Sequence, residues 1–385
     1  MDIVVGVIIG LIAITILVVI HELGHAIVAR RNGVVVEEFG VGFPPRVWGK
    51  KLKQSILGKN VLFSINALPL GGFVKLQGEH DTDTGKGDYG AVTVWQKTKI
   101  LLAGVFMNWI TAVVLFSILA LVGMPRILPN QFSVPADTQV IRQPVELVQI
   151  VEDSPAARAG LRQGDKILRF DGRPLEGASS LASLAEQSKG RSVEVRYVRN
   201  GVEEKAQVRL RDSNDDRRGY LGATSSQQEV MRASWSAPIV GVGTTIQMTV
   251  VTFQGLGEML AKAVSGFFLQ FSSDQTTRET AQRDLSSVGD NVAGPVGIFG
   301  IIFPAAGKAG PTHVLMLSAI ISLTLAVMNI LPIPALDGGR WAVMMVSRVL
   351  KKPLTAEREE KIHGTGFLIL MGLVVLITIA DIGKF

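Results

Sequence analysis

Long apolar runs separated by polar stretches dominate the chain. The first run covers residues 3–20, has no charged side chain and continues directly into the sequence HELGHAIVAR. Further runs cover residues 100–124, 313–336 and 367–380. Each approaches the roughly 20 apolar residues that an α-helix needs to cross a bilayer, and the fourth, the shortest, has room to begin a few residues earlier. The pattern predicts an α-helical polytopic membrane protein with about four transmembrane helices.

Residues 238–257 form one further uncharged stretch. It is rich in Gly, Thr and Gln, and Glu258 and Lys262 follow at once. As a fifth span it would move the basic segment 340–361 to the other side of the membrane. We therefore expect an amphipathic helix on the membrane surface here, with a fifth span as the alternative.

Residues 143–225 have a different pattern, with short alternating stretches typical of strands. The sequence SVEVRYVRNGVEEKAQVRLR alternates apolar and polar residues on both sides of Asn200-Gly201, and this dipeptide suits the positive φ angles of a type I′ turn. The preceding VELVQIVEDSPAARAGLRQGDKILRFDG indicates a strand, a short helix, a Gly-Asp turn and a second strand. The pattern predicts a small inserted α+β domain.

Charge is distributed unevenly along the chain. Lys and Arg total 39 against 33 Asp and Glu, and the formal net charge is +6. Basic residues gather between the first two predicted spans and between the last two. The positive-inside rule places both connections in the cytoplasm, and the N-terminus and residues 143–225 outside. Because the excess follows loops on one side of a membrane, it does not indicate a nucleic-acid partner.

His21, Glu22 and His25 form an HExxH pattern at the end of the first apolar run. The chain has no cysteine, so a zinc site must consist of His and carboxylate ligands. Two histidines four residues apart lie on one face of a helix and can bind the same ion. Glu22 lies beside them, where it can take a proton from a bound water molecule. The alternative is a pair of interfacial histidines with Glu22 facing water.

A third ligand is available in the sequence NILPIPALDGGR, residues 329–340. An unpaired Asp at the centre of a span costs roughly 2.5–3.5 kcal/mol on insertion scales, and a metal ion would offset that cost. Two prolines and the Gly pair after Asp337 interrupt the helix and allow the carboxylate to turn inward. Since the histidines and Asp337 all fall near the cytoplasmic ends of their spans, we expect them to meet. An ordinary Asp-Gly-Gly turn at a helix end is the alternative.

Together these motifs resemble the site-2 protease family of intramembrane zinc metalloproteases, most closely the bacterial regulator of sigma-E protease type. The similarity covers almost the whole chain and includes LPLGGFVKLQGE and AGPVGI. The resemblance implies one zinc ion per chain, held by His21, His25 and Asp337, with Glu22 as the catalytic residue.

Other positions match the family less specifically. Asn329 and Pro332 match an Asn-x-x-Pro signature, and Gly71 and Gly72 match a membrane-associated loop near the active site. Asn108 matches a further family residue, although the preceding Ala-Gly-Val departs from the Ala-Gly-Pro of relatives. The resemblance implies that these five residues contact the substrate or the transition state.

The family also carries a PDZ domain where this chain has residues 143–225. Tyr220, Leu221 and Gly222 match its carboxylate-binding loop, which implies a possible peptide C-terminus as ligand. A small β-domain without a peptide ligand is the alternative. By resemblance to the family, such a domain excludes substrates with bulky outer domains until another protease trims them.

Two other segments carry expectations of their own. Residues 61–76 have apolar β-type character with a Pro-Leu-Gly-Gly break, and we expect them to dip into the membrane and pair with an unwound substrate, chiefly through 62–66. The loop GEHDTDTGKGD around His80 contains Asp81, Asp83 and Asp88. We expect a solvated acidic loop there and not a cation site.

The expected function is intramembrane cleavage of the transmembrane segments of single-span proteins in the cell membrane, with anti-sigma factors or remnant signal peptides as family substrates. Two alternatives stay open: a membrane-anchored quality-control zinc protease, and a non-catalytic PDZ membrane scaffold. The expected domains are an N-terminal membrane part at 1–142, the PDZ-like domain at 143–225, a surface linker at 226–312 and a C-terminal membrane part at 313–385.

Overall fold

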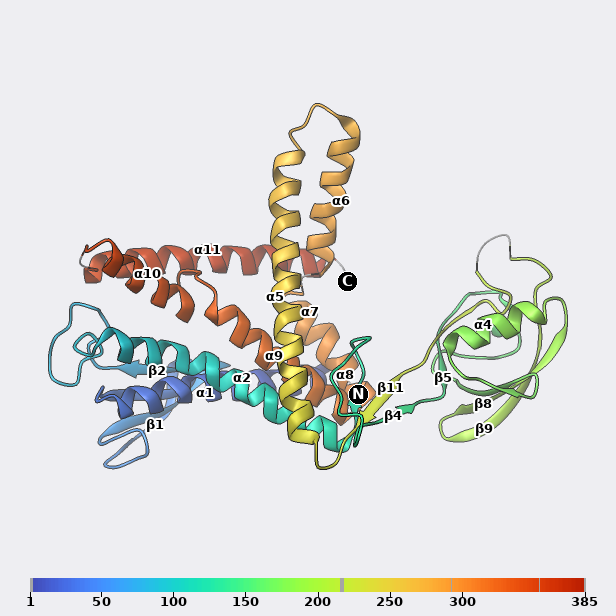
Figure 1. The fold of residues 1–385 in the computed structure, drawn as a ribbon, viewed down its shortest axis with the longest axis horizontal. Coiled ribbons are helices and arrows are strands. Elements are labelled where there is room, and N and C mark those ends of the chain that lie inside the picture. The colour runs from blue at the N-terminus through green and yellow to red at the C-terminus, as the bar shows by residue number, and fades with distance from the viewer. Residues whose placement is uncertain (1–2, 215–217, 292, 353, 384–385) are drawn as a thin grey trace. The chain divides into compact units, whose positions relative to one another are not determined.

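Five helices in the described part of the chain are long and apolar enough to cross a membrane, judged by length and composition. The computed structural model describes residues 3–214, 218–291, 293–352 and 354–383 (Figure 1). The five helices are α1 (Ile3–Arg31), α2 (Val94–Val122), α5 (Ala237–Leu269), α9 (Pro311–Ile330) and α11 (Ala356–Ile382). Four of them, α1, α2, α9 and α11, overlap the four predicted spans, so the polytopic α-helical class is confirmed.

The chain forms two compact units. The first consists of Met1–Val122, Phe132–Val134 and Trp235–Phe385, and the second of Gly123–Gln131 and Pro135–Ser234. All five long helices belong to the first unit. The second unit holds the strand-rich insert and extends beyond the predicted limits 143–225 on both sides.

The third predicted span, 313–336, is too long at its end. Helix α9 stops at Ile330, and a non-helical segment leads to α10 (Asp337–Val349). Proline removes a backbone donor and disfavours helical geometry in the residue before it, so Pro332 and Pro334 end the helix. Asp337 is therefore the first residue of a new helix and not part of a continuous span.

Helix α5 contains the stretch that we expected on the membrane surface. It is a single helix of 33 residues whose first half buries Val240, Gly241 and Thr244. Figure 1 shows α5 running across the direction shared by α1, α2 and α11. The length of α5 is sufficient to cross a membrane, whereas its direction suits a helix on the membrane surface. The surface position therefore stays a prediction. The rest of this region comprises α6 (Gln275–Asn291), α7 (Pro295–Gly297), a π-helix η1 (Ile298–Ile302) and α8 (Phe303–Ala309).

Two long bent strands, β1 (Val36–Leu52) and β2 (Val61–Leu76), form a sheet between α1 and α2 in sequence. Residues 62–65 of β2 pair on both sides, with 38–41 and with the later part of β1. Residues 72–76 pair on one side only, with 36–41. The two bent strands therefore build a sheet of four segments, whose outer segments are 72–76 and 46–52.

This sheet lies along the second half of α1. The Thr15 hydroxyl donates a hydrogen bond of 2.8 Å to the carbonyl oxygen of Pro69, in the bend of β2. At the other end, a Cβ atom at Gly58 would lie 3.2 Å from Nε of Arg30. Between these points Ala26 packs in an apolar cluster with residues from both strands. The bend of β2 thus lies beside the apolar run of α1, and the turn between the strands lies near its basic end.

The second unit has its own core. Its main sheet has the order β10-β5-β6-β8-β9, with β7 paired to β6, and a smaller sheet has the order β3-β11-β4. Leu147, Phe170 and Val195 are fully buried between the main sheet and α4. Asn200 and Gly201 have φ angles of 51° and 83°, which confirms the predicted hairpin turn. The predicted inserted α+β domain is present.

The elements of this unit have the following bounds. The strands are β3 (Met124–Pro125), β4 (Gln139–Arg142), β5 (Val145–Ile150), β6 (Lys166–Phe170), β7 (Arg173–Pro174), β8 (Ser192–Arg199), β9 (Val202–Arg209), β10 (Ala223–Ser226) and β11 (Glu229–Arg232), and the helices are α3 (Pro155–Arg158) and α4 (Ala178–Gln187). Residues 215–217 of the predicted domain lie outside the described residues.

Candidate metal centre

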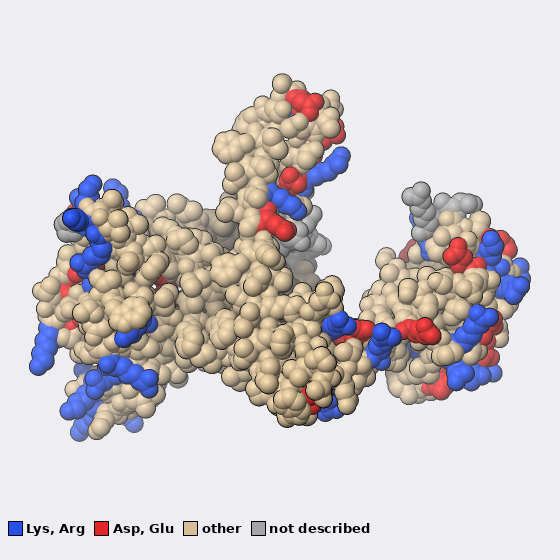
Figure 2. Space-filling model, in the orientation of Figure 1, with Lys and Arg blue, Asp and Glu red and all other residues tan. Residues whose placement is uncertain are grey.

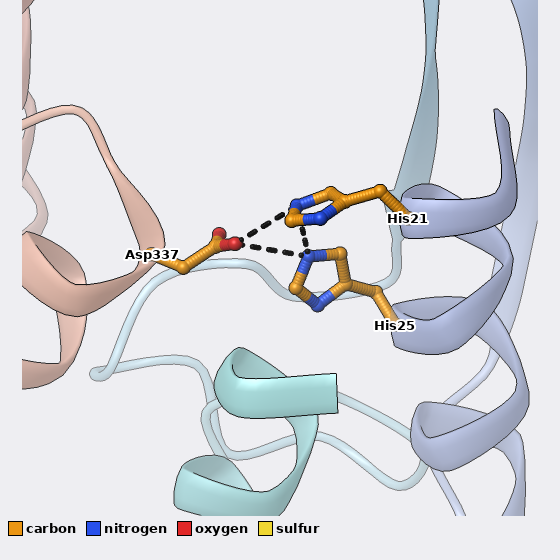
Figure 3. A group of neighbouring side chains, drawn as sticks. All are labelled: His21, His25 and Asp337. Atoms are coloured by element: carbon orange, nitrogen blue, oxygen red, sulfur yellow. Dashed lines mark hydrogen bonds and ion pairs between the residues drawn. The ribbon is translucent and has the colours of Figure 1, made fainter. Parts of the chain in front are cut away.

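Two imidazoles and one carboxylate converge in the first unit. Nε2 of His21 lies 3.0 Å from Oδ2 of Asp337, and Nε2 of His25 lies 3.2 Å from the same oxygen. The two Nε2 atoms are 3.2 Å apart. Figure 3 shows both rings projecting from α1 toward the carboxylate. Residues from opposite ends of the chain thus form the group with the geometry of a metal site, as predicted.

Close packing positions Asp337 at the start of α10. A Cβ atom at Gly338 would clash with the carbonyl oxygen of Ile330, and one at Gly339 would clash with that of Ile333. Only glycine lets the first turn of α10 approach the end of α9 so closely. The Asp-Gly-Gly sequence therefore does more than end a helix, because its two glycines bring the carboxylate against α1.

The tautomer of His25 suits metal binding. Its Nδ1 lies 2.7 Å from the carbonyl oxygen of Ile100 in α2. A carbonyl oxygen only accepts, so Nδ1 carries the proton and donates it. Nε2 then has a free lone pair facing Asp337, which is the arrangement of a histidine ligand oriented by an outer partner.

Asn108 gives His21 a comparable partner. Its Nδ2 lies 3.2 Å from Nδ1 of His21, and its Oδ1 is buried without a hydrogen-bond partner. The oxygen and nitrogen of a side-chain amide are distinguished by their hydrogen-bond partners, so we exchange Oδ1 and Nδ2 of Asn108 by a 180° rotation. Oδ1 then accepts from Nδ1–H of His21 and gains a partner, while Nε2 keeps its lone pair. The residues present therefore fit a zinc ion.

Gly104 leaves space at the same point. A Cβ atom there would lie 2.6 Å from Nε2 of His21 and closer still to Nε2 of His25. Gly24 of α1 approaches α2 equally closely, because its Cβ would lie 2.7 Å from the carbonyl oxygen of Ala103. Small residues on both helices thus bring the backbone of α2 over the imidazoles. Sequence reasoning did not assign this role to Gly104.

A cavity of about 300 Å³ opens beside His25 and Asp337. Its lining includes Glu22, residues 72–76 of β2 except Lys75, and the polar side chains of Glu79, Tyr89 and Arg340. Burial raises the pKa of Tyr89, so its hydroxyl stays protonated. The cavity combines a polar wall with apolar residues from β2, which suits a peptide in an extended conformation.

Glu22 faces this cavity without joining the metal ligands. Its Oε2 accepts a hydrogen bond of 3.1 Å from the backbone N–H of Val74 in β2. It therefore lies between the histidines that flank it in sequence and one outer segment of the sheet. This position beside the ligands is the one that the sequence predicted for a general base.

The structure separates the other predicted contacts. Gly72 lines the cavity, whereas Gly71 lies in the bend, where a Cβ would be 3.1 Å from Val18 of α1. Asn108 is fully buried behind His21 and contacts the ring instead of the cavity. Neither Asn329 nor Pro332 belongs to the lining of this cavity. Their expected roles in substrate handling stay predictions.

In the second unit, the predicted carboxylate-binding loop is well packed. Leu221 is buried in the core, and its carbonyl oxygen accepts a hydrogen bond from the N–H of Ala156. Gly222 has a φ of 70° and lies against Ser154. Tyr220 packs at the edge of the same core. Binding of a peptide C-terminus by this loop stays a prediction.

The acidic loop around His80 is ion-paired. Asp81 contacts the buried Lys97, and its Oδ2 lies 3.0 Å from a guanidinium nitrogen of Arg348 in α10. Nδ1 of His80 lies 3.8 Å from a carboxylate oxygen of Glu359 in α11. The expected solvated loop is therefore wrong at these positions. The partners come from distant elements, which the sequence alone does not bring together.

The fold and the site together define a multi-pass membrane zinc metalloprotease. Residues 9–373 match the family model of Peptidase family M50, and the chain belongs to this family. The site-2 protease resemblance is thus confirmed, and the class is that of intramembrane zinc proteases.

Two relatives are similar over almost their full length. A Clostridium perfringens protein whose name assigns it to the zinc metalloproteases is 31% identical over 376 residues, which cover 98% of each chain. The regulator of sigma-W protease RasP of Bacillus subtilis is 25% identical over 450 residues, which cover 96% of each chain.

Among solved structures, the PDZ domain of an SdrC-like protein from Listeria monocytogenes is 26% identical. It covers 22% of this chain and 87% of that one, with a TM-score of 0.20. The strand order of the second unit by itself defines its α+β fold.

Proposed function

We propose that this protein hydrolyses peptide bonds in transmembrane segments, at a zinc ion held by His21, His25 and Asp337. One observation carries the proposal: the three ligand atoms meet within hydrogen-bonding distances although Asp337 is 316 positions from His21. The site lies immediately after the apolar run of α1, at the end where basic residues follow. This placement supports cleavage near the cytoplasmic face.

Each residue then has a defined task. A zinc ion held by His21, His25 and Asp337 would lower the pKa of a bound water toward about 7 and would polarise the scissile carbonyl. Glu22 accepts the water proton and later returns it to the leaving amine. Ile100 and Asn108 hold the imidazoles of His25 and His21 in their metal-binding orientation.

The substrate binds as an added strand at residues 72–76. This outer segment lines the cavity and pairs on one side only, so its other side is open to a further strand. The expected contact through 62–66 is misplaced, because 62–65 already pair on both sides. An extended substrate here has its scissile bond near Glu22 and its amides free of helical hydrogen bonds.

Two carboxylates occupy this open edge in the described state. Glu22 accepts from the N–H of Val74 at 3.1 Å, and Oε1 of Glu79 accepts from the N–H of Leu76 at 3.0 Å. Carbonyl oxygens of a substrate strand, two residues apart, take the same places. Arrival of the substrate then releases Glu22 from Val74 and frees it for the water molecule.

The biological substrates belong to the finer part of the proposal. The name of the B. subtilis relative links that protein to regulation of sigma-W. We infer that this chain takes single-span proteins such as anti-sigma factors, with remnant signal peptides as a second substrate group. The N-terminus and the second unit face outward, because the basic connections define the cytoplasmic side.

The test compares purified variants on a single-span substrate in lipid. Glu22→Gln keeps zinc and loses turnover by several orders of magnitude, since only proton transfer is removed. Asp337→Ala loses both zinc and turnover. Glu186→Gln, on the exposed face of α4, serves as the control. Full zinc content together with full turnover in Asp337→Ala would overturn the proposal and favour a soluble-type third ligand.

A further inference from the structure

The outer segment 46–52 of the sheet and the turn that follows it carry an unbalanced positive charge. No acidic residue occurs between Glu38 and Glu79. Figure 2 shows Lys and Arg side chains gathered over the end of β1 and β2. These residues, called the basic edge below, are Arg46, Lys50, Lys51, Lys53 and Lys59.

The basic edge lacks carboxylate partners within the described part of the chain. All five of its residues are exposed, and none of them forms a described ion pair. Neighbouring cations of the first unit differ. Nζ of Lys75 lies 3.0 Å from Oε2 of Glu37, and Lys97 contacts Asp81. The charge of the basic edge is therefore available to an external anion.

Exposed apolar side chains lie directly beside these cations. Trp48 and Ile65 face each other across the strands, and each is 51% exposed. Phe43, which also lines the cavity beside Glu22, and Leu68 form a second such pair nearer the bends, at 44% and 50% exposed. Two exposed apolar cross-strand pairs in one sheet are unfavourable in water and suit contact with acyl chains.

Contacts with α1 place these groups at different depths. The bend of β2 lies beside Thr15 and Val18, within the uncharged run of α1. The turn of the basic edge lies beside Arg30, about 18 Å further along the helix axis. From the bend outward, the sheet thus presents Phe43 and Leu68, then Trp48, then lysines. The order is apolar residues, then an aromatic residue suited to the membrane interface, then cations. It matches the order of acyl chains, interface and headgroups in one bilayer leaflet.

Among the five described residues of the basic edge, Arg46 is the one that lies nearer the bends than Trp48 does. A Cβ atom at Gly49 would lie 3.1 Å from Cδ of Arg46 and 3.6 Å from its Nε. The side chain thus runs back over Gly49, toward the lysines of the basic edge. Long cationic side chains extend in this way to bring their charge to the headgroup layer.

We propose that the basic edge binds the anionic phospholipid headgroups of the leaflet in which α1 ends. The two apolar pairs pack among the acyl chains beneath. Headgroup contact fixes the 46–52 side of the sheet, and the sheet is continuous with the 72–76 segment that lines the cavity. Anionic lipid therefore sets the position of the segment that meets the substrate. Each basic side chain near an anionic surface strengthens binding by roughly fivefold.

The test uses a single fluorescent label on the full chain. Since the chain has no cysteine, Gln54→Cys in the exposed turn provides the only attachment point. The labelled protein is placed in nanodiscs of phosphatidylcholine alone or with increasing phosphatidylglycerol. The emission of an environment-sensitive dye shifts to the blue as phosphatidylglycerol increases, and added salt reverses the shift because it screens the charges.

Charge reversal identifies the side chains responsible. Lys50→Glu/Lys51→Glu/Lys53→Glu abolishes the blue shift and retains zinc, since these lysines lie outside the metal centre. The matched control is Lys189→Glu/Arg191→Glu/Lys205→Glu, which changes the net charge equally on exposed residues of the second unit and leaves the shift intact.

Three results decide against the proposal. They are equal spectra in the two lipid compositions, a shift that salt leaves unchanged, and a triple variant that responds as the wild type does. If the glutamate variant loses zinc, the corresponding Lys→Gln triple replaces it. If that variant also fails to assemble, the lipid and salt titration of the wild-type chain decides alone.

Discussion

Asn108 holds the ring nitrogen of His21 that does not face Asp337. The amide lies 3.2 Å from Nδ1, whereas Nε2 of the same ring lies 3.0 Å from the carboxylate of Asp337. Asn108 is fully buried, and the hydroxyl of Ser322 in α9 donates a hydrogen bond of 2.8 Å to its backbone carbonyl oxygen. Asn108 of α2 and Asp337 of α10 therefore hold the imidazole of His21 at its two ring nitrogens.

Replacing this amide is expected to weaken zinc binding. Asn108→Ala removes the partner of Nδ1, and the loss of such an outer contact typically lowers metal affinity about 10–100-fold. Affinity is measured by competition with a chromogenic chelator on purified protein. Ser322→Ala, which leaves the amide in place, is the control and keeps wild-type affinity. Equal zinc affinity in Asn108→Ala would show that the contact does not orient the ring.

Gly104→Ala is expected to remove the metal while the chain stays folded. The added methyl group enters the space next to both Nε2 atoms and forces the imidazoles apart. Zinc content and the thermal unfolding of the helices are measured together. Gly372→Ala in α11 is the control, because a Cβ there meets nothing within 4 Å. Wild-type zinc content in Gly104→Ala would mean that α2 does not press on the site.

The convergence of His21, His25 and Asp337 could be predicted from the sequence because the geometry that brings them together is local or topological. Four residues separate His21 from His25, and a helix then fixes their common face. Asp337 is remote, yet loop charge placed it on the same side of the membrane as the histidines. The side chains around them follow no such rule. Asn108 and Gly104 reach the site only through the crossing of α2 over α1, which no periodicity reveals.

The same distinction applies to the fold. Hydropathy identified the helices, since each needs only composition and length. It also extended the third span past Ile330, because apolar residues continue through the Pro-rich break. The sheet was harder to predict, because both strands bend and residues 62–65 pair twice. The alternation of side chains gives a strand its faces but does not say which of its edges stays open.

Removing Glu79 is expected to improve substrate binding. Its carboxylate occupies the N–H of Leu76, so Glu79→Ala leaves that donor free for a substrate carbonyl. One hydrogen bond of about 0.5–1.5 kcal/mol corresponds to a KM lowered roughly 2- to 10-fold. KM, kcat and zinc content are measured on a peptide substrate in detergent. Glu37→Ala is the control, since Glu37 faces Lys75 instead of the cavity. A raised KM in Glu79→Ala would contradict strand addition at this edge.

Arg199→Ala is expected to destabilise the second unit. Nε and one terminal nitrogen of Arg199 donate to the two carboxylate oxygens of Asp165 at 2.8 and 2.7 Å, and Asp165 is 1% exposed. Loss of the guanidinium leaves a buried charge without its main partner and costs roughly 3 kcal/mol. Chemical denaturation followed by hydrogen exchange of β8 reports it. Arg196→Ala removes the exposed pair with Glu194 and has little effect. Equal losses in both variants would contradict this account.

The register of β4 with β11 allows the inserted α+β domain to be excised cleanly. Arg142 pairs directly with Glu229. The chain therefore leaves this small sheet at residue 143 and re-enters it after residue 228, at neighbouring positions. Hydrogen bonds from Arg126 and Arg142 lower the pKa of Glu229, which therefore stays ionised and holds the two strands. Replacing 143–228 by an Asn-Gly turn converts β4 and β11 into a hairpin. The excised protein is expected to keep its zinc, because no ligand lies in this segment.

If the domain controls access, this excision changes selectivity and not chemistry. Substrates with a folded outer domain, which the full chain spares until they are trimmed, are then cut about as fast as trimmed ones. Cleavage of the trimmed and untrimmed substrates is followed by gel electrophoresis in cells that carry the full or the excised protein. The Glu22→Gln variant of each protein is the inactive control. Retained discrimination in the excised chain would mean that selectivity resides in the membrane unit, at the edge of β2 or in the helices around the cavity.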